Sequence, residues 1–389
     1  METSRIINHL GENREEYYMA ATPPIVASAN FCFHTVDEMR EGLAHESEIP
    51  FYTRGNNPTT NVLQKKMAAL EGTEECLVFA SGSAAVSAAV MANVQQGDHI
   101  ICVKKPYSWT NKLLNLYLPR FGVSATMVDG TRAENFEAAI QPNTKLIILE
   151  SPNSWTFELQ DVPAVAAIAK KHGITTIMDN SYCTPINHKP ADYGIDIICH
   201  SATKYISGHS DVVAGILCCS KEMYLKIFAT EFMTLGGVIS PFNSSMLLRG
   251  LRTLPIRLKQ VAENTMPVVE FLENHPMVDK VFYPFIPSHP QYELAKKLIK
   301  NPGGQFSITL KTEDPKQIET FCNSLELFLM ACSWGGFESL IFPAITLYSS
   351  ENYQTKDLPI NMIRFYVGLD DKDELIADLQ QAFDKMKNA

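Results

Sequence analysis

Seven short apolar runs, separated by segments with helical spacing, are the feature that most constrains the fold of this chain. Apolar runs of about four to eight residues are typical of buried strands, and apolar residues three and four apart predict amphipathic helices. Strands and helices that alternate in this way predict a mostly parallel sheet with helices on both faces. The predicted strands are Cys76–Ala80, Ile100–Val103, Val123–Val128, Leu146–Leu149, Ile174–Met178, Ile195–Cys199 and Val212–Cys218.

The pattern changes after about Leu235, where a second, smaller α/β domain is expected. Its predicted elements are a long helical stretch at Ser244–Asn274, strands near Gln305–Leu310 and Met362–Val367, and a closing helix at Asp371–Met386. A length of 389 residues with 46% hydrophobic content also favours two domains over one small core. We expect a polar N-terminal arm over residues 1–50, a first domain over 51–235 and a second over 236–389.

One further helix is predicted where the arm ends. Thr59 and Thr60 are candidate N-caps, and Gly72 is placed to end the helix. The apolar residues between them, Val62, Leu63, Met67 and Leu70, have helical spacing, which predicts one amphipathic helix.

Composition excludes several classes of partner. The 33 basic residues are outnumbered by 43 acidic ones and form no basic block, so no nucleic acid is expected. Apolar stretches are interrupted well before about 18 residues and the start of the chain is polar, so we expect no membrane span and a cytoplasmic location. The nine cysteines include no CxxC pair and the ten histidines no HExxH motif, so neither disulfides nor a metal are expected. A small-molecule partner is favoured.

Polar residues follow three of the predicted strands. Asp179 follows one run, Ser201 to Lys204 follow the next, and Ser81 to Ser83 follow the first and open a helix. Ligands in α/β sheets bind beyond the carboxyl ends of the strands, so these loops could converge on one cofactor. Taken singly, each feature has an ordinary reading as a surface lysine, a turn former or close helix packing.

Together these residue types match what pyridoxal 5′-phosphate (PLP) requires. PLP needs an amine to hold its aldehyde, an acid to keep its ring nitrogen protonated, and a cradle for its phosphate. Backbone N–H groups at a helix N-terminus suit the phosphate. The candidates are Lys204 for the amine, Asp179 for the acid, Gly82, Ser83, Ser201 and Thr203 for the phosphate, and Tyr107 to stack on the ring.

The segment His200–Asp211, which reads HSATKYISGHSD, resembles the cofactor-lysine signature of the Cys/Met-metabolism PLP enzymes, the transsulfuration family. The resemblance covers nearly the whole chain. It includes Tyr52–Thr59, Ser81–Ala85, Glu150–Pro152, Asp179–Ser181, Gly250–Leu254 and Ser333–Leu340. It implies the PLP-dependent transferase fold type I, with a seven-stranded sheet, and a Schiff base between PLP and Lys204.

The resemblance also implies roles for residues outside the three loops. The residues matching Tyr52 and Arg54 reach the cofactor phosphate of a neighbouring subunit, which implies a homodimer with shared active sites and, in this family, a tetramer of two such dimers. The residue matching Arg364 pairs with the α-carboxylate of the substrate, with Ser333 and Trp334 beside it. The residues matching Lys204 and Tyr107 are catalytic. The arm would then reach the neighbouring subunit, the first domain would bind PLP, and the second domain would complete the substrate site.

The expected reaction is a carbon–sulfur β-elimination of L-cystathionine to homocysteine, pyruvate and ammonia. Trp334, Ser154 with Trp155, and the segment after Lys204 are most similar to cystathionine β-lyases. In the other direction, Gly55–Thr59 is similar to γ-acting members. The γ-acting alternatives are cystathionine γ-lyase, methionine γ-lyase, cystathionine γ-synthase and O-acylhomoserine sulfhydrylase. The sequence leaves the roles of Trp109, Lys112 and Cys332 open.

Two alternatives belong to other functional classes. A nucleotide-binding module without PLP would need a GxGxxG motif or a phosphate-binding lysine loop after the first strand, and the sequence has neither. An inactive relative that acts as a binding protein is disfavoured, because Lys204, Asp179 and the phosphate-binding residues are all present.

Overall fold

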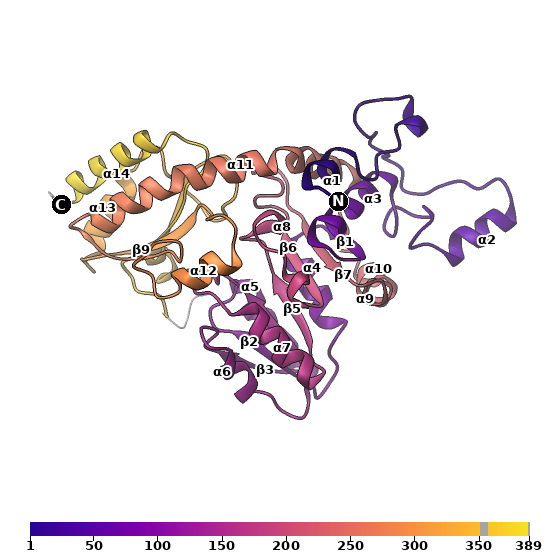
Figure 1. Cartoon of the computed structure of the whole chain (residues 1–389), viewed down its shortest axis with the longest axis horizontal. Helices are drawn as coiled ribbons and strands as arrows, with labels where there is room; N and C mark the ends of the chain where they lie inside the picture. Colours follow the sequence, from indigo (N-terminus) through magenta and orange to yellow (C-terminus); the bar gives the residue numbers. More distant parts are fainter. Residues whose placement is uncertain (351–356, 388–389) are drawn as a thin grey trace. The chain divides into compact units, whose positions relative to one another are not determined.

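The computed structural model describes residues 1–350 and 357–387. These residues form two compact units (Figure 1). The first contains residues 1–151, 160–207 and 211–253, and the second contains 152–159, 208–210, 254–350 and 357–387. The units meet in sequence inside one long helix, α11 (Pro241–Asn274), rather than at residue 235, where the spacing of the predicted strands changes.

The first unit is built on a seven-stranded sheet with the order β1-β7-β6-β5-β4-β2-β3. Its four pairs among β2 to β6 are parallel, and β7 runs antiparallel to both β1 and β6. The prediction of a mostly parallel seven-stranded sheet is therefore confirmed. The strands are β1 (Glu75–Phe79), β2 (His99–Val103), β3 (Ser124–Val128), β4 (Thr144–Glu150), β5 (Thr175–Asp179), β6 (Ile197–Ser201) and β7 (Gly215–Cys219).

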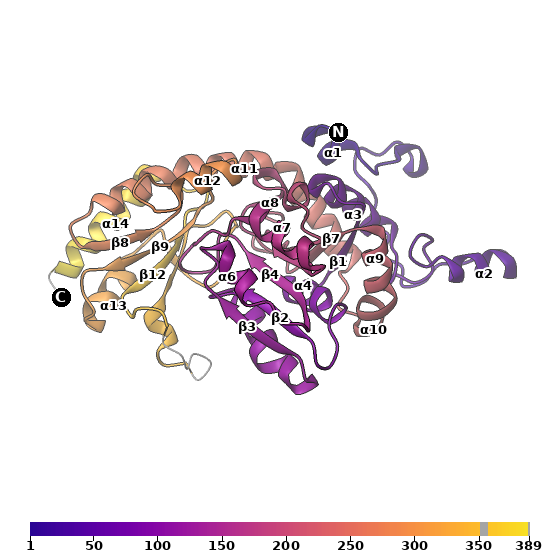
Figure 2. The same cartoon turned by 60° about the horizontal axis from the view of Figure 1, so that its bottom comes forward.

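Helices pack along this sheet (Figure 2). Helix α3 contacts β1 and β7, α4 contacts β6 and β7, and α7 contacts β5. The helices of the unit are α1 (Thr3–His9), α2 (Val36–Ala44), α3 (Pro58–Glu71), α4 (Gly82–Met91), α5 (Ser108–Lys112), α6 (Ala133–Ala138), α7 (Val162–His172), α8 (Thr184–Asn187), α9 (Lys221–Ile227) and α10 (Met233–Leu235). Shorter helical turns are η1 (Arg14–Tyr17), η2 (Leu113–Tyr117), η3 (Leu118–Phe121), η4 (Pro190–Tyr193) and η5 (Phe228–Phe232).

Helix α3 begins two to three residues earlier than the sequence predicts. Its N-cap is Asn57, whose side-chain oxygen accepts a hydrogen bond from the Thr59 amide at 3.0 Å, and Pro58 occupies the first turn. Thr59 and Thr60 are instead buried side chains, and the Thr60 hydroxyl contacts Ser244 of α11 at 2.9 Å. Gly72 ends the helix in the left-handed conformation at φ 81°, as predicted.

The second unit contains a five-stranded sheet with the order β10-β11-β12-β9-β8. The predicted strands β9 (Gln305–Leu310) and β12 (Met362–Tyr366) are neighbours at its centre, and the stacked rings of Phe306 and Phe365 pack there with centroids 5.5 Å apart. The other strands are β8 (Val278–Phe282), β10 (Leu329–Met330) and β11 (Leu340–Pro343). The remaining helices are α12 (Tyr292–Leu298), α13 (Pro315–Ser324), η6 (Ala344–Leu347) and α14 (Lys372–Lys387).

The described residues offer neither a membrane span nor a metal site. Across these ranges, no helix has both the length and the apolarity needed to cross a bilayer. In the same part of the chain, no cluster of three or more His, Cys, Asp or Glu side chains is arranged to hold a metal ion. The cytoplasmic location stays a prediction.

Candidate active site

Lys204 lies in a tight loop that follows β6. Its backbone N–H donates to the Ser201 carbonyl oxygen at 3.1 Å, and the side chain is half-buried. The Thr203 hydroxyl accepts from the Ala214 amide at 3.0 Å and lies 3.3 Å from the Ala214 carbonyl oxygen. The loop is therefore fixed to the chain that enters β7, and its lysine is held at the carboxyl end of β6.

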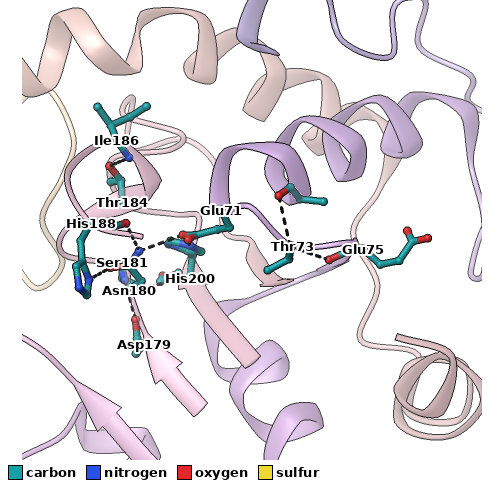
Figure 3. Close-up of polar contacts among 12 residues, drawn as sticks. Glu71, Thr73, Glu75, Asp179, Asn180, Ser181, Thr184, Ile186, His188 and His200 are labelled. Atoms are coloured by element: carbon teal, nitrogen blue, oxygen red, sulfur yellow. Dashed lines mark hydrogen bonds and ion pairs between the residues drawn. The ribbon is translucent and has the colours of Figure 1, made fainter. Parts of the chain in front are cut away.

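Asp179 ends the neighbouring parallel strand, β5. One of its carboxylate oxygens, Oδ1, accepts a hydrogen bond from the Ser181 amide at 2.9 Å. The Ser181 hydroxyl in turn accepts from the Ser201 amide at 2.6 Å. Figure 3 shows Asp179 and Ser181 in this part of the sheet. Ser181 thus joins the loop that carries Asp179 to the loop that carries Lys204.

The loop between β1 and α4 approaches the same place. Ser81 caps α4, since its hydroxyl oxygen accepts from the Ala84 amide at 3.1 Å. A Cβ atom on Gly82 would lie 2.8 Å from the Ser201 Cβ, and one on Gly215 would lie 2.0 Å from the Ser81 carbonyl oxygen. Only glycine permits these approaches, so the amide-rich start of α4 lies directly against the end of β6.

Tyr107 precedes α5 and is held through its backbone. Its N–H donates to a carboxylate oxygen of Glu150, the last residue of β4, at 2.6 Å. Its side chain is 43% exposed. Trp109 follows on α5, where the Lys112 ammonium lies 4.7 Å from the centre of the indole ring. The aromatic ring of Tyr107 is therefore presented outward from an anchored turn.

Tyr52 and Arg54 lie in the irregular segment before α3. Tyr52 makes an antiparallel bridge with Asn30, and the Thr53 amide donates to the Ala29 carbonyl oxygen at 2.9 Å. Both Tyr52 and Arg54 are exposed, and the guanidinium carbon lies 5.4 Å from the centre of the Tyr52 ring. This segment presents a cation and a phenol at the surface of the first unit.

Arg364 lies on β12 in the second unit, enclosed by aromatic rings. Its guanidinium carbon is 5.1 Å from the centre of the Trp155 ring and 5.2 Å from that of Phe342. The amide oxygen of the buried Gln305, when it faces Arg364 and Trp334, accepts hydrogen bonds from Arg364 Nε at 3.2 Å and from Trp334 Nε1 at 3.3 Å. These contacts fix the plane of the guanidinium, which a bidentate pair with a carboxylate requires.

Ser333 immediately precedes Trp334 and has an unusual backbone. Its φ is 83°, a region that non-glycine residues rarely adopt, and Gly335 follows at φ 84°. Such geometry is concentrated at functional sites. Cys332, before it, is exposed. The structure therefore brings Trp334 and Arg364 to one place, with Ser333 in the adjoining turn.

Comparison with known proteins agrees with this arrangement. The family model described as Cys/Met metabolism PLP-dependent enzyme matches residues 3–384. The chain belongs to this family. An L-methionine γ-lyase of Treponema denticola is 38% identical over 386 residues, 97% of this chain and 96% of that protein. The cystathionine γ-lyase of Homo sapiens is 37% identical over 380 residues, 96% and 91% of the two chains. The crystal structure of metB from Corynebacterium glutamicum superposes with a TM-score of 0.91 at 32% identity, covering 99% of this chain and 98% of that one.

A member of this family uses PLP, and the first unit fits that cofactor. The start of α4 offers N–H groups next to Ser201, at an approach so close that a Cβ on Gly82 could not be accommodated. The Asp179 carboxylate ends β5 and the Lys204 amine lies in the loop after β6, and these adjacent parallel strands end at the same edge. Burial, with the charge of Asp179, raises the pKa of the Cys199 thiol, so that this neighbour stays protonated. The fold type I expected from the resemblance is confirmed.

The sequence analysis assigned no role to three residues that position the predicted site residues. Ser181 contacts the side chain of Asp179, and Glu150 contacts the backbone of Tyr107. Gln305 contacts the side chain of Arg364. The role of Ser181 could have been found, because it lies only two residues after Asp179, in the segment Asp179–Ser181. Gln305 reaches residues far from it in sequence, and no local pattern marks such a contact.

Proposed function

We propose that this protein is a PLP-dependent lyase that breaks a carbon–sulfur bond by γ-elimination, with L-methionine and L-cystathionine as candidate substrates. The similarity to γ-lyases carries the proposal, since proteins with these names are 37–38% identical to nearly the full length of this chain. This similarity favours the γ-acting alternative over the β-elimination expected from the sequence.

The first unit supplies groups suited to the reacting end of the substrate. PLP, when bound, supplies an aldehyde for the substrate amine and a ring that accepts electrons. The Lys204 amine attaches the cofactor and then moves the proton of the substrate Cα. Asp179 balances the charge of the protonated ring nitrogen, and the start of α4 with Ser201 and Thr203 holds the phosphate. Tyr107 stacks on the ring and orients the incoming amine.

A γ-elimination requires a second proton transfer that a β-elimination does not. The proton on Cβ must also be removed before the bond between Cγ and sulfur can break, so the same amine must reach two neighbouring carbons. The half-buried Lys204 side chain is flexible enough for this role once it is released from the cofactor.

Arg364 is the proposed receptor for the α-carboxylate of the substrate. The Gln305 contact at Nε orients the guanidinium, while the rings of Trp155 and Phe342 partly shield it from water. Reduced solvation strengthens a charge-assisted pair, and bidentate binding fixes the orientation of the substrate. Ser333 is expected to contribute a hydroxyl beside it.

β-Elimination of L-cystathionine is the second candidate, favoured by one observation. Trp155 and Trp334, two of the residues that resemble β-lyases, both lie at the Arg364 site, the first against the guanidinium and the second on Gln305. Residues that distinguish family members therefore surround the proposed carboxylate receptor.

Product analysis of the purified holoenzyme separates the two candidates. γ-Elimination converts L-methionine to methanethiol, 2-oxobutyrate and ammonia, and L-cystathionine to cysteine, 2-oxobutyrate and ammonia. β-Elimination of L-cystathionine gives pyruvate and homocysteine, and L-methionine has no sulfur at Cβ. We expect 2-oxobutyrate. Pyruvate without 2-oxobutyrate would establish the second candidate, and no keto acid from either substrate would contradict both. A Lys204→Ala sample processed in parallel controls for contaminating lyases.

We also propose that the protein is a homo-oligomer in which each active site is completed by Tyr52 and Arg54 of a neighbouring subunit, assembled as a tetramer of two such dimers. The exposure of both side chains in the single chain supports this arrangement. The residues 1–50 would form the arm at the subunit interface.

A further inference from the structure

A cluster of four polar side chains is buried inside the first unit, behind Asp179. Glu71, Asn180, His188 and His200 are each at most 4% exposed. Glu71 Oε1 receives two contacts, from His200 Nε2 at 2.6 Å and from Asn180 Nδ2 at 3.0 Å. Figure 3 shows the Glu71 carboxylate beside His200 and facing Asn180, with His188 on the other side of Asn180. The cluster thus joins the end of α3 to the ends of β5 and β6.

The orientation of the Asn180 amide is fixed from both sides. Burial lowers the pKa of His188 to about 4, so its ring is neutral near pH 7. Its Nδ1 lies 3.2 Å from Asn180 Oδ1, an acceptor, and therefore carries the ring proton. Asn180 Nδ2 donates both to the His188 carbonyl oxygen at 3.0 Å and to Glu71. All the side-chain polar atoms of Asn180 are engaged.

Stability alone does not account for the cluster. Within the described residues, Glu71 Oε2, His200 Nδ1 and His188 Nε2 are buried without a hydrogen-bond partner. Buried polar atoms left in this state destabilise a fold, and buried ion pairs are poor stabilisers compared with apolar packing. A cluster with three such atoms is better explained by the positions that it imposes on its neighbours.

Those neighbours are the residues proposed to hold PLP. Asn180 directly follows Asp179, and its backbone N–H donates to the Cys199 carbonyl oxygen at 2.8 Å. His200 directly precedes Ser201, which Ser181 ties to the Asp179 loop at 2.6 Å. Glu71 therefore holds, through one side chain on each strand end, the residue after Asp179 and the residue before Ser201.

We propose that Glu71, acting through Asn180 and His200, is a positioning residue that sets the Asp179 carboxylate and the Ser201 loop in register for PLP. The inference rests on the proposed placement of the ring at Asp179. A carboxylate is suited to this role, because one oxygen can accept from two donors on different strands. None of the four cluster residues is among those proposed to contact the substrate, so the role does not depend on which sulfur amino acid is used.

Replacement of the carboxylate by an amide tests the inference without using the reaction. Glu71→Gln keeps the size of the side chain but can no longer accept two charge-assisted hydrogen bonds. We expect PLP to dissociate from the purified variant about tenfold more readily, as after the loss of one hydrogen bond to a charged group. The visible circular-dichroism band of the bound cofactor should also decrease, because its ring is held less uniformly.

Glu12→Gln is the matched control. The Glu12 side chain is also fully buried, and its Oε1 contacts Lys66 of α3, the helix that Glu71 ends, at 3.0 Å. Glu12 also forms ion pairs with Arg14 and Arg252. Unlike Glu71, it is not bonded to the ends of β5 and β6. This variant should lower the thermal midpoint of the apo-protein yet keep the cofactor affinity and the dichroism of the wild type. A Glu71→Gln protein that behaves in the same way would overturn the positioning role.

Two further variants complete the test. His200→Gln retains an N–H near the position of Nε2 and should keep most of the cofactor affinity, whereas His200→Leu should resemble Glu71→Gln. Equal PLP affinities of the two His200 variants would overturn the inference, even if Glu71→Gln does not fold. Asp179→Asn separates this inference from the site on which it rests. If Asp179→Asn weakens PLP binding and Glu71→Gln does not, the cluster is structural. If Asp179→Asn has no effect, the placement of the ring fails, and the inference fails with it.

Discussion

Lys204 is the residue on which the proposed chemistry depends most directly. No other group can replace its amine as both the attachment point and the carrier of the Cα proton, so Lys204→Ala should lower kcat for keto-acid release by at least about 10³-fold. The phosphate cradle is separate from the amine, so the variant should still bind PLP without the covalent link. Borohydride should fix the cofactor to the wild-type chain only. Turnover near the wild-type rate would contradict the assignment.

His188 gives a residue-scale prediction for the pH dependence of stability. Its folded-state pKa is lowered to about 4 from 6.5, so the unfolded chain binds a proton first as the pH falls. Its contribution to stability is complete above pH 6.5 and decreases toward pH 4, by at most about 3 kcal/mol. His188→Asn keeps an N–H for Asn180 and does not titrate. The free energy of unfolding of this variant should decrease by about 2 kcal/mol less between pH 7 and pH 4.5 than that of the wild type. An equal decrease would show that His188 titrates normally.

At the scale of elements, the site depends on how closely three loops approach one another. Gly215 begins β7 where a Cβ would lie 2.0 Å from the backbone oxygen of Ser81, an atom that cannot move without displacing α4. Gly215→Ala should therefore cost about 1–3 kcal/mol of unfolding free energy and weaken PLP binding.

Gly237→Ala provides the control for this prediction. Its added Cβ would lie 3.4 Å from Ala84 Cβ, an ordinary contact, so that variant should behave like the wild type. Denaturant unfolding of the two apo-variants measures the difference. Equal midpoints would show that the approach of β7 to the α4 loop is not tight.

The elements also explain what the sequence could and could not predict. All seven strands of the large sheet were predicted, because each lies in a short, mainly apolar run. Six of them are largely buried, and the edge strand β3 is only partly so. Strands β8, β10 and β11 were not predicted. The β8 sequence VDKVF exposes Asp279 and Lys280, both residues of β10 are exposed, and β11 ends in proline. Such short edge or irregular strands have no clear periodic signal.

The same reasoning applies to the site. Asp179, Ser201 and Lys204 could be grouped from the sequence because parallel strands end at one edge of a sheet. Glu71 could not, since its contacts with His200 and Asn180 join residues 129 and 109 positions apart. The substrate predicted from the sequence depended on Trp155 and Trp334. These residues were read by resemblance, and their contacts with Arg364 and Gln305 appear only in the fold.

At the scale of the whole molecule, one helix of the N-terminal arm has a surface suited to a second copy of the chain. Val36, Met39 and Leu43 of α2 recur at helical spacing and are 66%, 51% and 60% exposed. An apolar stripe of this kind favours burial in an interface. Tyr52 and Arg54 follow in the same part of the chain, so an interface formed by the arm would bring them toward a neighbouring subunit.

Mixing two inactive variants tests whether active sites are shared. If Arg54 binds the phosphate of the neighbouring subunit, a dimer of one Arg54→Ala chain and one Lys204→Ala chain contains one site with both residues intact. Each variant alone should be poorly active, whereas an equal mixture, denatured and refolded together so that chains exchange, should recover about a quarter of the wild-type sites. Differently tagged chains allow the mixed dimers to be isolated and assayed for keto-acid release. If each site used Arg54 of its own chain, every site in a mixed dimer would lack one of the two residues. Inactive, purified mixed dimers would therefore show that Arg54 acts within its own subunit or only maintains the fold.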